Sequence, residues 1–309
     1  MTAIEIRNLT KRFGDVTALA GFDLSVPRGS IFGFLGPNGA GKTTTLRIMA
    51  GLARATAGRV VIEGVEVGRG VRPPIGYLPD TPGFYGWMTA REFLSYIARL
   101  HGLGDPPIDA TLERVGLADV GSKRVGGFSR GMKQRLGLAQ ALLPQPRVLL
   151  LDEPVSALDP AGRKAMLDIM GELRGEMTVF FSTHILGDAE RVCDEIGIIN
   201  RGRLVIQARR DDLLARFARP AFEIELAPDE APRLAALAER LDATGWIERA
   251  ALDGTRLRVT ARDLDRARRE ALAMLADLPV VRFEMLGATL EDIFLSLTQQ
   301  AGAQPEVVR

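Results

Sequence analysis

Short apolar runs alternate with helix-like patterns along the first two thirds of the chain. The runs are only a few residues long, which is typical of buried strands, and they lie at residues 30–35, 60–63, 75–78, 148–152, 177–182 and 196–200. Strands that alternate with helices form sheets whose strands run mostly in parallel. The pattern up to about Gln207 therefore predicts an α/β domain with a largely parallel sheet.

A group of helical patterns interrupts this alternation between the runs at 75–78 and 148–152. The turn-rich stretch 80–88 precedes the group, and the segment 103–107, which contains Gly and Pro, breaks the chain within it. The helical patterns themselves cover residues 90–100, 108–115 and 131–143. We expect an inserted helical subdomain at about residues 88–145.

The pattern starts again after Arg219-Pro220. Strands are predicted at 221–226, 246–251, 255–260 and 280–284, with helices at 231–241 and 264–276. The order β-α-β-β-α-β is that of a ferredoxin-like α+β unit. We therefore expect a first domain at 1–219 and a small accessory domain at 220–309. A last amphipathic helix at 290–298 places Leu290, Ile293, Phe294 and Leu297 on one face, which suits closure over the small sheet or docking on the first domain.

Composition narrows the range of partners. Lys and Arg total 40 against 39 Asp and Glu, so no overall positive field favours nucleic acid, and no nucleic-acid partner is expected. The longest apolar stretches fall well short of the roughly 18 residues of a membrane-spanning helix, so another chain would have to cross any membrane involved. The start of the sequence does not match a signal peptide and Cys193 has no intrachain partner, which favours the cytosol.

A phosphate-binding loop is the strongest chemical signal. Residues 36–43 read Gly-Pro-Asn-Gly-Ala-Gly-Lys-Thr, between the strand at 30–35 and a helical pattern at 44–50. This is the G-x-x-x-x-G-K-[ST] motif in its proper context, where backbone N–H groups and the helix N-terminus surround phosphate oxygens. The motif predicts ATP binding with Mg²⁺ on Thr43. The candidate nucleotide-binding residues are Gly36, Pro37, Asn38, Gly39, Ala40, Gly41, Lys42, Thr43 and Thr44.

Two adjacent carboxylates, Asp152 and Glu153, end the apolar run at 148–152. The carboxyl ends of parallel strands meet at one edge of a sheet, which places the pair beside the phosphates. Asp152 suits a magnesium ion held through its water shell. Glu153, pointing the other way along the strand, suits polarisation of an attacking water. On the pair alone, a solvated strand end is an equal alternative.

A third segment, residues 128–135, reads Phe-Ser-Arg-Gly-Met-Lys-Gln-Arg and lies between the loop and the carboxylates. By itself it reads as a helix N-cap. In combination with the other two motifs, the chain resembles the ATP-binding cassette (ABC) ATPases, whose signature motif is similar to Leu-Ser-Gly-Gly-Gln. The resemblance implies a P-loop NTPase cassette fold. It also implies that Ser129 and Gly131 contact the γ-phosphate held by a second copy of the chain, in a head-to-tail dimer around ATP.

Further positions match the family. Phe13 resembles the aromatic residue that stacks on adenine, residues 156–159 resemble the loop that contacts the partner subunit, and His184 resembles the switch histidine. Asp80 stands where the family has glutamine or glutamate, so its place in the metal site is in question. Arg130 and Met132 replace a glycine and a glutamine of the signature, and we hypothesise that Arg130 assists the bound γ-phosphate.

The resemblance implies the ATP-hydrolysing subunit of a transporter, similar to multidrug and antibiotic exporter subunits. Such a subunit sits at the cytoplasmic side of the cell membrane, attached through separately encoded transmembrane permease subunits. The alternative is a soluble ABC ATPase that acts on DNA or ribosomes, although the chain has neither a long coiled-coil insertion nor a second cassette. An RNA-binding C-terminal module is disfavoured because the segment 255–260 lacks aromatic residues.

Overall fold

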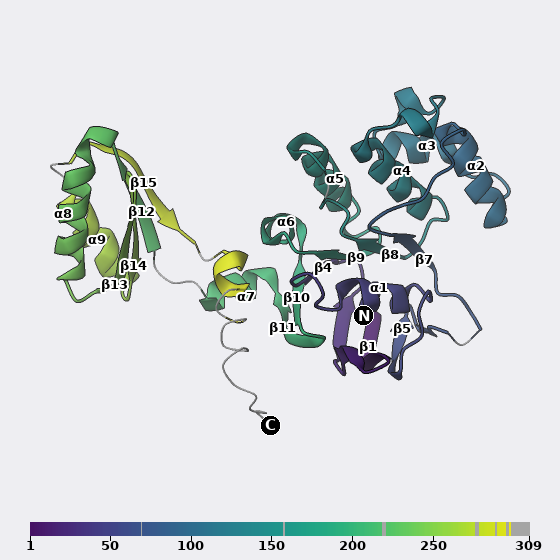
Figure 1. Cartoon of the computed structure of the whole chain (residues 1–309), viewed down its shortest axis with the longest axis horizontal. Coiled ribbons are helices and arrows are strands. Elements are labelled where there is room, and N and C mark those ends of the chain that lie inside the picture. The colour runs from purple at the N-terminus through teal and green to yellow at the C-terminus, as the bar shows by residue number, and fades with distance from the viewer. Residues whose placement is uncertain are drawn as a thin grey trace. The chain divides into compact units, whose positions relative to one another are not determined.

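The computed structural model describes residues 1–68, 70–156, 158–217, 221–275, 278–287, 289–294 and 297. The chain divides into two compact units (Figure 1). The first is built on Met1–Arg210 and the second comprises Asp211–Ile293. The change of unit thus comes between Arg210 and Asp211, whereas the sequence pattern places it after residue 219.

The main sheet of the first unit contains six strands in the order β11-β10-β4-β9-β8-β7. Its neighbouring strands from β10 to β7 all pair in parallel, and only the edge strand β11 is antiparallel. This confirms the predicted mostly parallel sheet. The strands are β4 (Ile31–Leu35), β7 (Ile75–Leu78), β8 (Val148–Asp152), β9 (Thr178–Thr183), β10 (Glu195–Asn200) and β11 (Arg203–Arg209).

A second, antiparallel sheet is built around the long strand β1 (Thr2–Phe13). Its partners are β2 (Val16–Ala20), β3 (Leu24–Pro27) and β5 (Ala57–Ile62), and β5 also pairs with β6 (Val65–Glu66). The strand predicted at 60–63 is confirmed as part of β5, but it belongs to this antiparallel sheet and not to the parallel one. The reason is non-local: β5 pairs with the first strand of the chain, a contact that no local pattern encodes.

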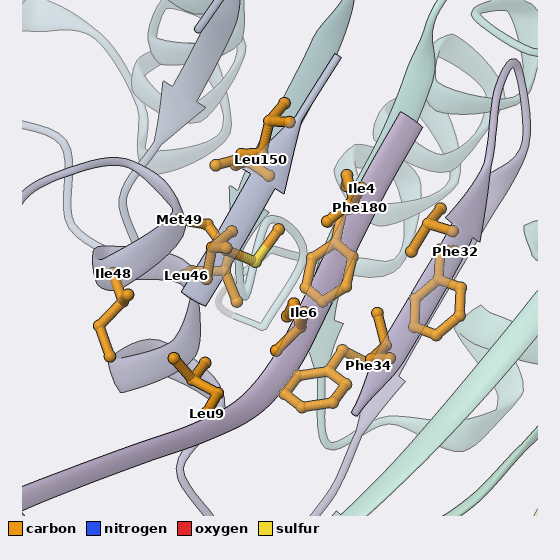
Figure 2. Close-up of a cluster of buried hydrophobic side chains, with 14 of the residues drawn as sticks. Ile4, Ile6, Leu9, Phe32, Phe34, Leu46, Ile48, Met49, Leu150 and Phe180 are labelled. Carbon is orange, nitrogen blue, oxygen red and sulfur yellow. The ribbon is translucent and has the colours of Figure 1, made fainter. Parts of the chain in front are cut away.

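The core of the first unit lies between the two sheets and α1 (Lys42–Met49) (Figure 2). Phe32 and Phe180 come from adjacent strands and stack with ring centroids 5.2 Å apart. Figure 2 shows apolar side chains of both sheets and of the helix directed toward one another. Those that are fully buried include Ile4, Ile6, Leu9, Phe32, Phe34, Leu46, Met49, Leu150 and Phe180. This packing holds the start of α1, and the loop before it, against the sheet.

The remaining helices of the first unit fall into two groups. Three lie between β7 and β8 in the chain and form the expected insert, namely α2 (Ala90–Leu100), α3 (Ile108–Arg114) and α4 (Arg130–Leu142). The helix α2 starts at a capping box in which Thr89 and Glu92 satisfy each other's backbone N–H groups. The second group, α5 (Pro160–Glu172) and α6 (Leu186–Val192), covers the face of the main sheet opposite α1 and β1 (Figure 1).

The second unit begins in α7 (Arg210–Phe217) and contains a four-stranded antiparallel sheet in the order β13-β14-β12-β15. This confirms the predicted ferredoxin-like arrangement. Its strands are β12 (Ala221–Leu226), β13 (Ile247–Asp253), β14 (Arg256–Ala261) and β15 (Val280–Leu286), and its helices are α8 (Ala231–Asp242) and α9 (Leu264–Met274). Apolar side chains of the sheet and helices, among them Phe222, Leu237 and Leu257, form a separate core.

The predicted last helix is described only in part. Residues 290–294 are helical, while 295, 296 and 298 lie outside the described residues. Leu290 and Ile293 are buried, as expected of its apolar face. In the part of the chain that the structure describes, no helix combines the length and the apolar character that a membrane crossing needs.

Candidate functional site

A cavity of about 370 Å³ opens at the carboxyl ends of the main-sheet strands. This is where polar loop residues collect in a parallel sheet, because every strand directs its following loop to the same edge. Residues 37–39 and 41–44 of the glycine-rich loop form much of the wall. The remaining lining residues are Ala18, Asp80, Glu153, Ser156 and His184.

The glycines of the loop are required by its conformation and by close contacts. A Cβ atom at Gly36 would lie 2.3 Å from the carbonyl oxygen of Ile199. Gly41 has a φ of 109°, and a Cβ atom there would lie 2.6 Å from Leu19 Cδ2. Neither position accommodates another residue without displacing the backbone or the core. The shape of the loop therefore depends on glycine at both positions.

Lys42 is buried and fully engaged within the cavity wall. Its Nζ donates hydrogen bonds to the carbonyl oxygens of Gly36, at 2.6 Å, and Pro37, at 3.2 Å. It also forms an ion pair with Glu153 Oε1 at 3.2 Å. Burial of a lysine is costly unless its charge is neutralised, and Glu153 provides that neutralisation. The lysine thus lies at the centre of the loop, where a phosphate would meet it.

Asp152 and Thr43 form the oxygen cluster beside this lysine. Thr43 Oγ1 donates to Asp152 Oδ1 at 3.1 Å, and Ser182 Oγ donates to the same oxygen at 2.8 Å. Burial raises the pKa of Asp152, and the hydrogen bonds from Ser182 and Thr43 oppose that rise. Magnesium prefers a few hard oxygen ligands together with water and substrate phosphates. The hydroxyl and carboxylate oxygens, with the carboxylate of Asp80 in the cavity wall, fit that ion.

Glu153 occupies an unusual backbone position. The strand β8 ends at Asp152, and Glu153 has a φ of 48°, in the left-handed region that few residues other than glycine adopt. Its backbone N–H donates to Ser182 Oγ at 3.0 Å. Its carboxylate contacts both Lys42 and His184, with Nδ1 of His184 2.9 Å from Oε2. The chain turns at Glu153, so simple strand alternation does not describe the direction of its side chain.

The structure brings one set of predicted residues together and leaves another set apart. The phosphate-binding loop, Asp80, Glu153 and His184 line the cavity, and Asp152 accepts a hydrogen bond from Thr43. Ser129 and Gly131 do not line it: Ser129 is exposed and caps α4, accepting a hydrogen bond from the Met132 N–H at 3.2 Å.

Phe13 is one more predicted residue that lies outside the wall of the cavity. It is 55% exposed, with Lys11 Nζ 4.6 Å from its ring centroid. In the loop 156–159, Asp159 caps α5, while Ala157 lies outside the described residues.

Two residues of the site escape the sequence patterns. Ser182 links Asp152 to Glu153, yet it reads as an ordinary member of the strand before His184. Ala18 lies in β2, a strand without a strong apolar run. The two-residue turn Gly14-Asp15 between β1 and β2 was the available signal for this hairpin.

The fold and the site together define a nucleotide-binding protein of the P-loop class. The family described as ABC transporter matches residues 19–156. The uncharacterized ABC transporter ATP-binding protein YxlF of Bacillus subtilis (strain 168) is 39% identical, over 95% of this chain and 99% of that protein. The daunorubicin resistance ATP-binding protein DrrA3 of Streptomyces coeruleorubidus is 37% identical, over 96% of both chains.

A solved structure is similar to this chain in fold and in sequence. The ATP-binding subunit of an ABC transporter matches with a TM-score of 0.63 and 31% identity, over 70% of this chain and 93% of that one. The chain belongs to the ABC transporter ATP-binding proteins, a family that hydrolyses ATP to power transport. This membership favours transport over the alternative of a cassette ATPase acting on DNA or ribosomes.

Proposed function

We propose that this chain is the ATP-hydrolysing subunit of an exporter and that two copies bind two Mg²⁺-ATP between them, head to tail. The observation that carries the proposal is the division of the site. Lys42, Glu153 and His184 meet around one cavity, whereas Ser129, at the start of α4, is exposed and outside its wall. A second copy would bring its own Ser129 to the open side of that cavity.

The start of α4 has the chemistry of an anion site. Ser129 is the N-cap of a 13-residue helix, so it lies at the positive end of the helix dipole, beside the N–H groups of the first turn. Arg130, the first residue of the helix, is exposed and adds a positive charge. These groups suit the γ-phosphate of a nucleotide held by the other copy.

Hydrolysis would use the groups around the cavity as follows. Lys42 and the loop N–H groups bind the phosphates, and Thr43 and Asp152 would hold a magnesium ion that neutralises phosphate charge. When ATP draws Lys42 toward its phosphates, Glu153 loses one of its two partners and its carboxylate is free to orient a water molecule. His184, 2.9 Å from Glu153, steadies that carboxylate and the γ-phosphate.

The transport role rests on the relatives. DrrA3 is named for daunorubicin resistance and aligns over 96% of this chain, a share that extends beyond the first unit. We infer export of a small molecule by permease subunits that are separate chains, with this subunit on the cytoplasmic face of the membrane. Purification of the tagged chain from membranes in mild detergent tests this inference. A polytopic protein should copurify, whereas ribosomes or DNA in its place would contradict the transport role.

The dimer is tested with Glu153→Gln. This variant keeps the shape of the side chain and removes its ability to activate water, so turnover should fall about 100-fold or more and ATP should hold the dimer together. Light scattering after gel filtration should give twice the monomer mass with Mg²⁺-ATP and the monomer mass with ADP. The matched control is Glu153→Gln with Ser129→Arg, which should stay monomeric with ATP. A dimer in the control, or a monomer in the single variant, would contradict the proposal.

A further inference from the structure

Asp188 is a buried carboxylate to which the proposed mechanism gives no role. It lies on α6, four residues after His184, and is 2% exposed. A buried charge is costly unless it is paired. Its Oδ1 accepts hydrogen bonds from Arg163, whose Nε and Nη2 both lie 2.6 Å away. Its other oxygen, Oδ2, has no hydrogen-bond partner among the described residues.

Arg163 ties Asp188 to a different part of the site. It lies in the first turn of α5, directly after the loop that ends at Asp159. The Asp159 side chain caps this helix by accepting from the Gly162 N–H at 3.2 Å, and the Arg163 N–H donates to the Asp159 carbonyl oxygen at 2.9 Å. These contacts with Asp159 fix the backbone of Arg163, and so the point from which its side chain reaches Asp188.

The segments that precede α5 and α6 both contact Glu153. At the start of α6, His184 contacts the Glu153 carboxylate at 2.9 Å. In the loop before α5, the Ser156 hydroxyl donates to the Glu153 carbonyl oxygen at 3.2 Å. The pair of Arg163 and Asp188 links the two helices and so closes this ring of contacts. Burial raises the pKa of Asp188, while the hydrogen bond and charge of Arg163 and the charges of Arg191 and His184 act in the opposite direction.

A second ion pair between the same helices has a different character. Arg191 Nη2 on α6 lies 2.6 Å from Asp168 Oδ1 on α5. These side chains are 45% and 48% exposed, whereas the Asp188 side chain is 3% exposed. Exposed pairs contribute little because water solvates both partners when they separate. The outer pair is thus a matched control for the inner one.

We propose that Arg163 and Asp188 are positioning residues for ATP hydrolysis, which hold the start of α6, and with it His184, in register with the loop 156–159 and Glu153. The inference rests on the proposed function, in which His184 and Glu153 act on ATP. Neither Arg163 nor Asp188 needs to touch the nucleotide. Their pairing sets where the imidazole of His184 lies when ATP is bound.

The test measures ATP hydrolysis by the full chain with Asp188→Asn, an almost isosteric change that removes the charge. We expect kcat to fall about tenfold to 100-fold, with KM and the ATP dissociation constant within twofold of the original chain, because misplacement of a catalytic group affects turnover more than binding. Asp188→Glu should recover part of kcat. The control Asp168→Asn should change kcat less than twofold. Unchanged kcat in Asp188→Asn would overturn the proposal.

A double-variant comparison separates positioning from general damage. If Asp188 acts through His184, Asp188→Asn should have no further effect on the residual turnover of His184→Ala. An equal loss in both backgrounds would overturn the proposal. If Asp188→Asn does not fold, Arg163→Gln, at a side chain that is 35% exposed, enters the same comparison. Full turnover in His184→Ala alone would instead contradict the proposed function, so the two failures are distinguishable.

Discussion

The two units of this chain contain sheets of opposite design. In the first unit parallel strands direct their loops to one edge, and there Lys42, Glu153 and His184 share a cavity. In the second unit all neighbouring strands are antiparallel, so adjacent strands of the sheet end at opposite edges. Several charged side chains of its sheet pair with one another, as Arg256 does with Glu225 at 3.4 Å. Strand direction, more than composition, therefore determines where the reactive side chains gather.

The largest effect is expected from a substitution in the core of the second unit, which should leave the first unit unchanged. Phe222→Ala removes a fully buried ring from the core of the second unit and should cost that unit about 3–5 kcal/mol of stability. Hydrogen exchange of the strands β12 to β15 measures the loss, and the ATP dissociation constant should not change. Val281→Ala, at a side chain that is 66% exposed, is the control and should have little effect. A change in ATP affinity would show that the units are not independent.

Lys42→Ala should abolish the chemistry of the first unit without affecting the second. It removes the charge that meets the phosphates and leaves the Glu153 carboxylate with His184 alone. Steady-state phosphate release should fall by about 100-fold or more. Hydrogen exchange in the second unit should be unaltered. Turnover within tenfold of the original chain would contradict the role given to the lysine.

Asp152→Asn should stabilise the first unit while it weakens magnesium-dependent ATP binding. Burial raises the pKa of Asp152, so the ionised carboxylate destabilises the fold. This penalty is absent below the ordinary carboxyl pKa of 3.8 and grows as pH rises through the pKa in the folded chain. The melting temperature of the variant should therefore exceed that of the original chain at pH 7, and the difference should shrink toward pH 4. A variant that melts lower at pH 7 would refute this reading of the carboxylate.

The smallest effect is expected on the sheet of the second unit. Arg256→Gln breaks the contacts with Glu225 and Glu223, but the arginine side chain is 51% exposed. Its loss should change the free energy of unfolding by about 0.2–1 kcal/mol and reduce its dependence on salt. Urea denaturation at low and high salt measures both quantities. A loss above about 2 kcal/mol would mean that this ion pair is not screened as an exposed one should be.

Much of this molecule is readable from local pattern. The loop at 36–43 follows a strand and opens a helix as its motif requires, and β7 and β8 begin and end where the apolar runs predict. The ferredoxin-like order of the second unit follows from the spacing of short strands and helices. These features depend on residues near one another in the chain, and that is why periodicity and turn chemistry suffice to predict them.

Local sequence is sufficient to specify the phosphate-binding loop, the strand ends next to Asp152 and His184, and the order of elements in both units. Long-range packing specifies the rest: β5 pairs with β1, Ser182 joins Asp152 to Glu153, and Lys42 and His184 both contact the Glu153 carboxylate. Each of these contacts joins segments far apart in the chain. Their geometry follows from sheet pairing and from the left-handed turn at Glu153, which the packing of the whole core imposes and no local pattern contains.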